Sequence, residues 1–417
     1  MASLLIEGNN RLSGKISAHG AKNSALPILA ASYLVDDKSV LNNCPRLSDV
    51  DVAIEILEHL GCKTKICGNE VEIDSSGADF SCVPFELMQK MRSSIIFLGA
   101  ILAKCKKAKM CLPGGCELGP RPIDIHLKAL EMMGAEIDIS CGKIECEAKR
   151  LHGCKIDLPF PSVGATENIL IAAVTAEGDT IIHNAAREPE IADLASYLIE
   201  CGAKISGAGE SIIKISGVNK LRGARHKIIP DRIEAATFMA AGAITKSDIC
   251  VDKIIPEHIQ PVLFAFKEAG CSFDIYDDSI TLHSPPRLNR VKTVRTLVYP
   301  GFPTDFMSPF LAMMTVAKGT SIFIETIFQN RFKQTDDLIR MGASIKIEDR
   351  VAVVEGVDHL CGTNVSATDL RGGAALIVAA LGAYGTTKID NICHIDRGYE
   401  NIEEALSQIG AKIKRIN

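Results

Sequence analysis

Hydrophobic positions along this chain follow one order that repeats six times: a helical pattern, then Gly-Ala or Gly-Cys, then a strand-like alternation. The glycines of the six copies are Gly61, Gly134, Gly202, Gly270, Gly342 and Gly410, at intervals of 68 to 73 residues. Each glycine stands where a helix C-terminus needs a residue that tolerates positive φ. Each alternation that follows suits a half-buried strand. So regular a spacing predicts a repeated structural unit.

Each copy also contains a second apolar helix upstream of its glycine. We expect these helices at residues 24–34, 91–105, 166–176, 233–245, 306–317 and 370–384. A short strand and a loop join the two helices, so the unit is expected to run helix, strand, helix, then two strands. The fold class is therefore α/β, with each copy adding a similar layer to a common core.

The sixth copy lacks the hairpin that follows the other glycines. The N-terminal run 4–14 is similar to the end of the hairpin in the third and fifth copies. We therefore expect residues 1 to about 21 to pair with the C-terminal half of the chain. The two domains would then be 22–229, and 1–21 together with 230–417, each with three copies.

Composition is that of an ordinary globular protein. The 417 residues are 47% hydrophobic and 23% charged, which allows a large core and two or three domains. A net charge of −5 without a long Lys/Arg run argues against nucleic acid or an anionic membrane as the main partner. Apolar stretches such as 95–103 are far shorter than the roughly 20 residues of a membrane span. We expect a cytoplasmic protein without membrane insertion, and nothing indicates an obligatory protein partner.

The fifteen cysteines are an odd number in a long chain without a signal peptide, which favours reduced thiols. There is no Cys-x-x-Cys, no His-Glu-x-x-His and no closely spaced His pair. We therefore expect neither a metal ion nor another cofactor.

Polar residues that would be costly to bury recur at two equivalent places in the units. One place is the start of the first helix, with Lys22, Asn23, Arg92, Ser162 to Gly164, Asp231, Arg232, Asp305, Asp369 and Arg371. The other is the loop after the short strand, with Arg46, the run 113–124, Arg187, Glu188, Arg331 and Arg397. If the units are arranged alike, these positions line one end of each domain. Two such ends facing one another would form a cleft.

Helix N-termini and arginines both favour anions, so we expect a strongly anionic ligand. The Gly- and Pro-rich segment 112–122 has the composition of a lid whose closure excludes water. Cys116 is the only thiol in such a loop, and Arg121 lies five residues on. A nearby cation favours the thiolate, which is a nucleophile, and the protonated thiol is a general acid.

Each of these residues also has a purely structural interpretation. Asp231, Asp305 and Asp369 each precede a helix, where a carboxylate is most often an N-cap worth about 1 kcal/mol. The sequence by itself therefore does not select Asp305. An isolated arginine is more often a solvated surface charge than a ligand clamp. The arginines for which both interpretations stay open are Arg46, Arg187 and Arg232.

Seven segments, taken together, match one known family. They are 21–27, 113–124, 163–166, 184–190, 302–305, 367–371 and 394–399. Through them the chain strongly resembles the UDP-N-acetylglucosamine 1-carboxyvinyltransferases, nearly end to end. The resemblance implies an inside-out α/β barrel of six repeats in two domains, with helices inside and sheets outside. It also implies transfer of the enolpyruvyl group of phosphoenolpyruvate to the 3-hydroxyl of UDP-N-acetylglucosamine with release of phosphate. That reaction is the first committed step of peptidoglycan precursor synthesis.

The resemblance also implies individual roles. Asp305 would take the proton from the sugar hydroxyl, and Cys116 would deliver a proton to phosphoenolpyruvate or form an adduct with it. The cations would hold the donor, with Lys22, Arg121 and Arg397 on its phosphate and Arg331 and Arg371 on its carboxylate. Further substrate contacts would be Asn23, Arg92, Pro122, Ile123, Asp124, Ile125, Ser162, Val163, Gly164, Ile327 and Asp369. Cysteine rather than aspartate at 116 implies inactivation by the epoxide antibiotic fosfomycin.

Three places depart from the family's pattern, namely Phe160, the run 306–309 and Gln329. Two rival functions also stay open. One is the related reaction on shikimate 3-phosphate, against which the Cys116 loop and the Lys22 motif argue. The other is a non-catalytic nucleotide-sugar sensor, which would be expected to have lost Cys116, Asp305 or Lys22.

Overall fold

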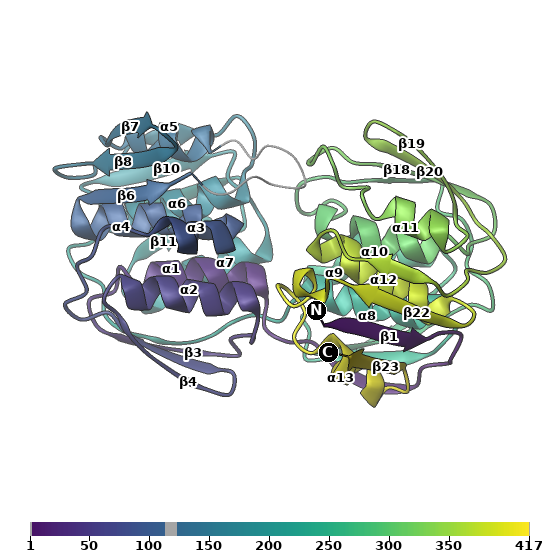
Figure 1. Ribbon diagram of the computed structural model, residues 1–417. Coiled ribbons are helices and arrows are strands. Elements are labelled where there is room, and N and C mark those ends of the chain that lie inside the picture. The colour runs from purple at the N-terminus through teal and green to yellow at the C-terminus, as the bar shows by residue number, and fades with distance from the viewer. Residues whose placement is uncertain (1, 113–122, 417) are drawn as a thin grey trace. The chain divides into compact units, whose positions relative to one another are not determined.

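The computed structural model of the chain describes residues 2–112 and 123–416, apart from the side chain of Arg92. The chain divides into two compact units. The N-terminal unit comprises residues 20–112 and 123–229, and the C-terminal unit comprises residues 2–19 and 230–416. Each unit contains three copies of the repeated unit (Figure 1).

The N-terminal unit contains the first three copies. The first is α1 (Lys22–Ser32), β3 (Lys38–Asn42), α2 (Ser48–His59), β4 (Lys63–Cys67) and β5 (Glu70–Asp74). The second is α3 (Phe85–Lys90), the 3-10 turn η1 (Arg92–Ile96), α4 (Phe97–Cys105), β6 (Lys107–Cys111), α5 (Asp124–Met132), β7 (Glu136–Ser140) and β8 (Lys143–Glu147). The third is β9 (Lys155–Asp157), α6 (Val163–Ala173), β10 (Asp179–His183), α7 (Pro189–Glu200), β11 (Lys204–Ser206) and β12 (Ile212–Ser216).

The C-terminal unit contains the other three. The fourth is α8 (Arg232–Ile244), β14 (Ile249–Asp252), α9 (Pro256–Glu268), β15 (Ser272–Ile275) and β16 (Ser279–His283). The fifth is β17 (Thr293–Arg295), α10 (Thr304–Met314), β18 (Thr320–Ile324), α11 (Thr335–Arg340), β19 (Ser344–Glu348) and β20 (Val351–Glu355). The sixth is β21 (Asn364–Ser366), α12 (Leu370–Gly382), β22 (Thr386–Asp390), the 3-10 turn η2 (Ile392–His394), α13 (Ile402–Gln408) and β23 (Lys412–Ile416).

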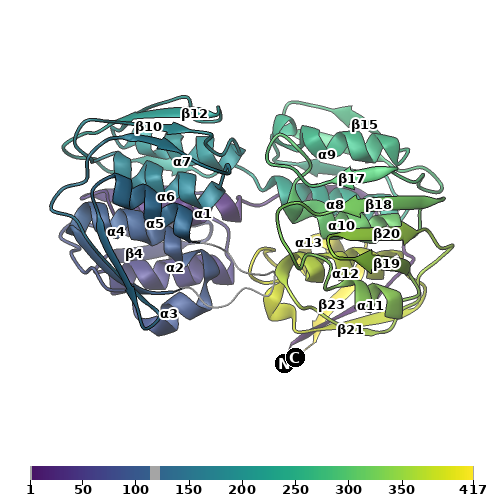
Figure 2. The same cartoon turned by 90° about the horizontal axis from the view of Figure 1, so that it is seen from above.

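The first helix of each copy lies inside its unit. In the C-terminal unit α8, α10 and α12 pack against one another, and in the N-terminal unit α4 packs against both α1 and α6 (Figure 2). These helices are buried on all sides rather than along one stripe, and most of their residues are apolar. In α12, for example, every residue from Arg371 to Leu381 is buried. Small sheets lie outside the helices, so the inside-out α/β fold is confirmed.

Each copy contributes one outer sheet. In the N-terminal unit the strand orders are β13-β3-β5-β4, β6-β8-β7 and β11-β12-β10-β9, where β13 is Arg225–Lys227. In the C-terminal unit they are β15-β16-β14-β2, β17-β18-β20-β19 and β21-β22-β1-β23, where β1 is Ser3–Glu7 and β2 is Gly14–Ser17. The hairpin strands pair antiparallel, whereas short strands such as β17 pair parallel with the strand after the first helix.

The six repeated glycines have the backbone conformation that the sequence predicts. Their φ angles are all positive, from 95° to 102°. The same two hydrogen bonds recur at each of them: Gly61 N donates to Glu58 O, and Cys62 N donates to Leu57 O. This pair of bonds satisfies the last carbonyls of the helix and turns the chain into the hairpin. A side chain at these positions would be strained, because L-residues avoid this region.

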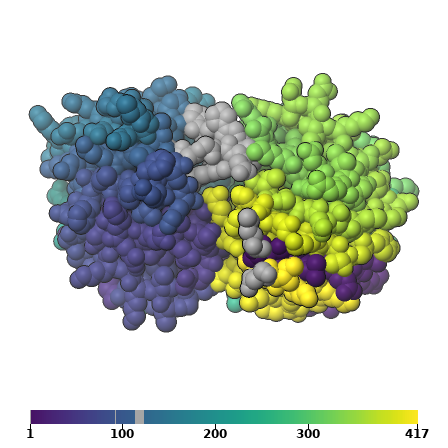
Figure 3. All heavy atoms as spheres, in the orientation of Figure 1, coloured from purple at the N-terminus to yellow at the C-terminus, as the bar shows by residue number. Residues whose placement is uncertain are grey.

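The N-terminal residues complete two sheets of the C-terminal unit. β1 pairs antiparallel with β22 on one side and with β23 on the other. β1 therefore takes the place of the missing second hairpin strand, as the sequence predicts. β2 pairs parallel with β14. Figure 3 shows the N-terminal atoms in purple set among the yellow C-terminal atoms on that face.

Three details differ from the expected elements. All six first helices end where predicted to within about three residues, but several begin earlier than predicted, as α1 does at Lys22. Their first turns are polar, so hydrophobic periodicity does not reveal them. The helix expected at 91–105 is a 3-10 turn followed by α4. The short parallel strands β9, β13, β17 and β21 were not expected, because three residues carry too little pattern.

We predict that Ile6→Ala in β1 lowers the free energy of unfolding of the C-terminal unit by about 2–5 kcal/mol. Ile6 is 0% exposed and lies between two strands, so the shortened side chain leaves a cavity. Urea denaturation would measure the loss. Leu5→Ala, on the half-exposed outer face of the same strand, is the matched control and should cost much less. Equal losses for the two variants would contradict this placement of β1.

Candidate functional site

Asp305 joins two buried arginines at the start of α10. Its Oδ1 accepts a hydrogen bond from Nη2 of Arg331 at 2.7 Å, and its Oδ2 accepts one from Nη2 of Arg371 at 3.0 Å. The Asp305 side chain is 29% exposed, whereas the two arginine side chains are 2% and 3% exposed. The carboxylate is therefore the accessible member of a triad whose cations lie beneath it.

Arg371 is held from the first turn of α12. Asp369 is the N-cap of this helix, and its Oδ1 accepts from the backbone N of Arg371 and of Gly372, each at 3.0 Å. The Nη1 of Arg371 donates to the hydroxyl of Tyr399 at 3.2 Å. Burial by itself lowers the pKa of Arg371, but Asp305, together with Tyr399 and Asp231, outweighs that effect and the net pKa is raised. Arg371 therefore stays cationic.

Arg331 is held by a different set of contacts. Its Nε donates to Oγ1 of Thr304 at 3.1 Å, and its guanidinium carbon lies 5.0 Å from the ring centre of Phe328. The loop that carries it starts at Glu325, whose Oε1 accepts from the backbone N of Ile327 at 2.7 Å and of Phe328 at 3.1 Å. A buried carboxylate thus shapes the loop before Arg331.

The three aspartates that the sequence left equivalent have different roles. Asp231 caps α8, accepting from the backbone N of Ile233 at 2.8 Å and of Glu234 at 3.0 Å. Asp369 caps α12 in the same way. Asp305 is instead the second residue of α10, whose N-cap is Pro303. Its carboxylate is therefore available to the two arginines rather than committed to the helix.

In the N-terminal unit, the helix start at Lys22 is also charged. Lys22 is the first residue of α1 and is 9% exposed, and its Nζ lies 2.8 Å from Oδ2 of Asp49. Asp49 is 2% exposed and lies in the first turn of α2. The ion pair offsets part of the cost of burying the ammonium group. Asn23 follows Lys22 and is half-buried.

The start of α6 is closely packed on α5. Ser162 caps α6, accepting from the backbone N of Ala165 at 3.4 Å. Gly164 faces His126, and a Cβ there would lie 3.0 Å from the imidazole Cε1. His126 is 7% exposed, and its Nδ1 lies 2.8 Å from Nδ2 of Asn168, which donates. Burial lowers the pKa of His126 to about 4, with Asp124 opposing the shift. The ring is therefore neutral.

The remaining predicted site residues fall into four groups. Ile123, Asp124, Ile125 and Val163 lie at the starts of α5 and α6, with Asp124 exposed and 3.5 Å from Lys128. Ile327 and Arg397 lie in loops of the C-terminal unit, and Arg397 is half-buried. Arg92 opens η1. Cys116, Arg121 and Pro122 lie outside the described residues. The structure thus brings Asp305, Arg331, Asp369 and Arg371 together, while the cleft expected between the domains stays a prediction.

Sequence reasoning missed Thr304, Glu325 and Tyr399, which hold the two arginines. Glu325 alone gave a signal, because it directly follows the apolar strand β18. A carboxylate next to a buried strand must find hydrogen-bond donors. A threonine before an aspartate, or a tyrosine in a loop, has no such pattern.

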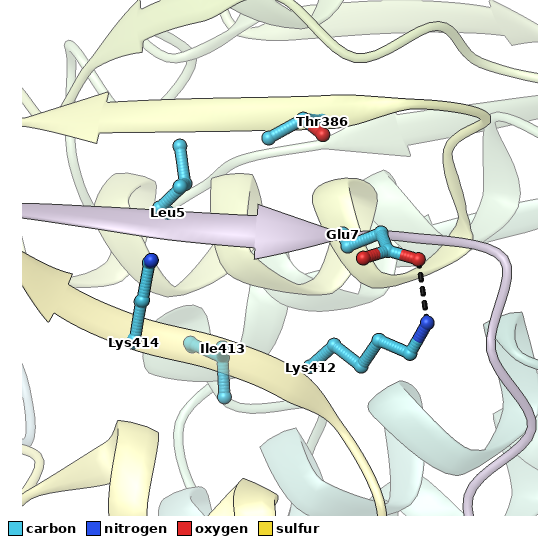
Figure 4. Close-up of a pocket in the computed structure, with 6 residues that line it drawn as sticks. All are labelled: Leu5, Glu7, Thr386, Lys412, Ile413 and Lys414. Atoms are coloured by element: carbon cyan, nitrogen blue, oxygen red, sulfur yellow. Dashed lines mark hydrogen bonds and ion pairs between the residues drawn. The ribbon is translucent and has the colours of Figure 1, made fainter.

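Some other features carry no part of this chemistry. Figure 4 shows a hollow on the outer face of the β1 sheet, lined by Leu5, Glu7, Thr386, Lys412, Ile413 and Lys414. None of these is a predicted site residue. In the part of the chain that the structure describes, no group of three or more His, Cys, Asp or Glu is placed to hold a metal ion. Over the same residues, no helix combines the length and apolarity needed to cross a membrane.

Comparisons with known proteins agree on one family. The model of the EPSP synthase (3-phosphoshikimate 1-carboxyvinyltransferase) family matches residues 6–406. UDP-N-acetylglucosamine 1-carboxyvinyltransferase 2 of Caldanaerobacter subterraneus subsp. tengcongensis is 50% identical, and the match covers 100% of this chain and 100% of that protein. The UDP-N-acetylglucosamine 1-carboxyvinyltransferase of Finegoldia magna is also 50% identical, over 100% of this chain and 99% of its own.

Solved structures share the fold. The enolpyruvyl transferase NikO from Streptomyces tendae has a TM-score of 0.90 at 25% identity, over 99% of this chain and 98% of its own. EPSP synthase from Acinetobacter baumannii has a TM-score of 0.76 at 19% identity, over the whole of both chains. The fold and the family match define the class as carboxyvinyltransferases, which are transferases. Within that class, the chain belongs to the UDP-N-acetylglucosamine 1-carboxyvinyltransferase family.

We predict that His126 makes the protein less stable in acid. The unfolded imidazole, with a pKa of about 6.5, binds a proton as the pH falls from 7 to 4.5, whereas buried His126, with a pKa of about 4, hardly does. Wild type should lose about 2–3 kcal/mol more of its free energy of unfolding over this range than His126→Gln. Chemical denaturation at each pH measures this. Identical pH dependence of the two proteins would refute a buried neutral ring.

Proposed function

We propose that this protein transfers the enolpyruvyl group of phosphoenolpyruvate to the 3-hydroxyl of UDP-N-acetylglucosamine and releases inorganic phosphate. The observation that carries the proposal is the accessible carboxylate of Asp305 above two buried arginines. Full-length identity of 50% to carboxyvinyltransferases of that name supports the choice of acceptor. The reaction would be the first committed step of peptidoglycan precursor synthesis.

The charges of the site suit the donor. Phosphoenolpyruvate has a carboxylate and a phosphate, and planar guanidinium groups bind carboxylates through paired hydrogen bonds. We assign the carboxylate to Arg331 and Arg371, with Asp369 close to them. We assign the phosphate to Lys22, Arg121 and Arg397. These cations would stabilise the charge that develops in the transition state.

The bond changes follow from these roles. The acceptor 3-hydroxyl oxygen bonds to C2 of the donor while Asp305 takes the hydroxyl proton, and C3 gains a proton from the Cys116 thiol. Loss of phosphate from C2 and of a proton from C3 then restores the double bond in the product. Metal ions have no part in these steps. Alternatively, Cys116 forms a covalent adduct with the donor.

Asp305 has to change partners during this reaction. In the structure both of its oxygens accept hydrogen bonds from arginines, which stabilises its ionised form. The donor carboxylate would compete for the same Nη2 groups. Arrival of the donor would thus release Asp305 to accept the hydroxyl proton, so the base would become available only when the donor is in place.

Asp305→Ala should reduce phosphate release at least about 100-fold, because general-base catalysis contributes about that much or more. The variant should fold, with a free energy of unfolding lower by about 3 kcal/mol, because Arg331 and Arg371 lose their shared counter-charge. Steady-state kinetics and thermal unfolding measure the two effects. Asp336→Ala, an exposed acid in the first turn of α11, is the control. Normal turnover of Asp305→Ala would exclude it as the base.

Two acceptors separate the proposal from its nearest rival. With phosphoenolpyruvate as donor, phosphate release should require UDP-N-acetylglucosamine and should not occur with shikimate 3-phosphate. The family match includes enzymes named for the second substrate, so the comparison is direct. Activity with shikimate 3-phosphate alone would reassign the enzyme. Absence of phosphate release with both acceptors, together with binding of the nucleotide sugar, would indicate a sensor.

The cellular role follows from the reaction. We propose a cytoplasmic enzyme of cell-wall biogenesis, on which cell shape and division depend. The Cys116 loop would make it a target of fosfomycin, although that loop lies outside the described residues.

A further inference from the structure

Glu325 is a carboxylate with almost no access to water, directly after β18. It is 1% exposed. Its Oε1 accepts from Oγ1 of Thr296 at 2.9 Å and from two backbone N–H groups, and its Oε2 accepts from Oγ1 of Thr304 at 2.8 Å. Burying an ionised carboxylate is costly unless every acceptor position finds a donor. A structural loop anchor alone would need only Oε1.

The bond from Thr304 to Glu325 fixes the direction of a hydrogen-bond chain. A hydroxyl has one proton to donate, and a carboxylate can only accept. The Thr304 hydroxyl is therefore the hydrogen-bond donor to Glu325. The lone pairs of the Thr304 oxygen are then left to accept the N–H of Arg331 Nε at 3.1 Å. Glu325 therefore orients the hydroxyl that orients Arg331.

This series of hydrogen bonds ends at Nη2 of Arg331, the atom that would bind the donor carboxylate. The guanidinium group is planar, so a bond at Nε sets the plane in which Nη2 reaches Asp305 at 2.7 Å. Arg371 does not share this support, because it is held by the cap of α12 and by Tyr399. The two arginines can therefore be perturbed one at a time.

We propose that Thr304 and Glu325 are positioning residues that hold the guanidinium of Arg331 in the orientation required to bind the donor carboxylate. The inference rests on the proposed function, which assigns that carboxylate to Arg331. The proposed function assigns neither residue a contact with a reacting atom. Glu325 also leaves negative charge near Arg331 when Asp305 turns to the acceptor hydroxyl.

The direct test is Thr304→Val, which keeps the shape of the side chain and removes the oxygen. We expect kcat/KM for phosphoenolpyruvate to fall about 10- to 100-fold, by analogy with the loss of a group that orients a metal-binding side chain. The fall should lie mainly in KM for phosphoenolpyruvate, with KM for UDP-N-acetylglucosamine unchanged. Thr304→Ser keeps the hydroxyl and should restore kcat/KM to within about threefold of wild type.

Thr326→Val is the matched control. The Thr326 hydroxyl lies in the loop that carries Arg331. It donates to the backbone O of Thr296 at 2.6 Å and lies 3.4 Å from the Thr296 hydroxyl, so its loss also removes partly buried hydrogen bonding. It has no bond to Arg331 in the described structure, and its kcat/KM should stay within about threefold of wild type. An equal fall for Thr326→Val and Thr304→Val, or a fall for Thr304→Ser as large as for Thr304→Val, would overturn the proposal.

A second readout does not depend on the substrates. In ¹⁵N-labelled protein, the Arg331 Nε–H proton should exchange with water about tenfold faster or more in Thr304→Val than in wild type and Thr304→Ser. An unchanged exchange rate of this proton in Thr304→Val would refute the hydrogen bonding from Glu325 through Thr304 to Arg331, whatever the substrates of the enzyme are. If Thr304→Val does not fold, Glu325→Gln carries the same test, because its amide N–H would compete with Arg331 for the Thr304 oxygen. Wild type without phosphate release would instead refute the proposed function.

Discussion

Burial of two guanidinium groups against one carboxylate is the constraint on which this site depends. Taking a cation out of water costs several kcal/mol unless a counter-charge and further hydrogen bonds compensate. Asp305 supplies the counter-charge to both Arg331 and Arg371. It does so because α10 and α12 pack side by side inside their unit, which brings their first turns together. Residues 66 positions apart in the chain thereby meet at one pair of atoms.

The repeated architecture explains where these residues lie, and local differences explain what they do. Every copy begins its buried helix at a comparable place, so polar side chains that start these helices are presented alike. At the starts of α8 and α12 an aspartate satisfies the free backbone N–H groups. At α10 the N-cap position is held by Pro303, so Asp305, two residues later, is not the capping residue. Aspartates near the helix start thus cap the helix in two copies and pair with arginines in a third.

This distinction marks the limit of what the sequence reveals. Repeated sequence patterns predict the glycine spacing, the alternating strands and the pairing of the N-terminal run. The fold follows from these features. The caps and the triad are not periodic. Nothing in the sequence tells that Asp305 faces Arg371 while Asp369 faces its own backbone, because that depends on a shift of two residues at the helix start. Thr304 is missed because its partners Glu325 and Arg331 lie 21 and 27 positions away, and the pattern around Glu325 shows that it needs donors but not which ones.

The triad also restricts how the site can operate under the proposed function. A carboxylate with both oxygens bound to guanidinium groups is a poor proton acceptor, and two arginines without an anion are costly to keep buried. The first state is stable but unreactive and the second is costly, so the departure of Asp305 has to coincide with the arrival of another carboxylate. Tyr399 and Thr304 keep the arginines in place through that exchange, because their bonds involve neither anion. Binding of the donor and activation of the base are therefore one event, and a base released in this way does not act on an acceptor bound without its donor.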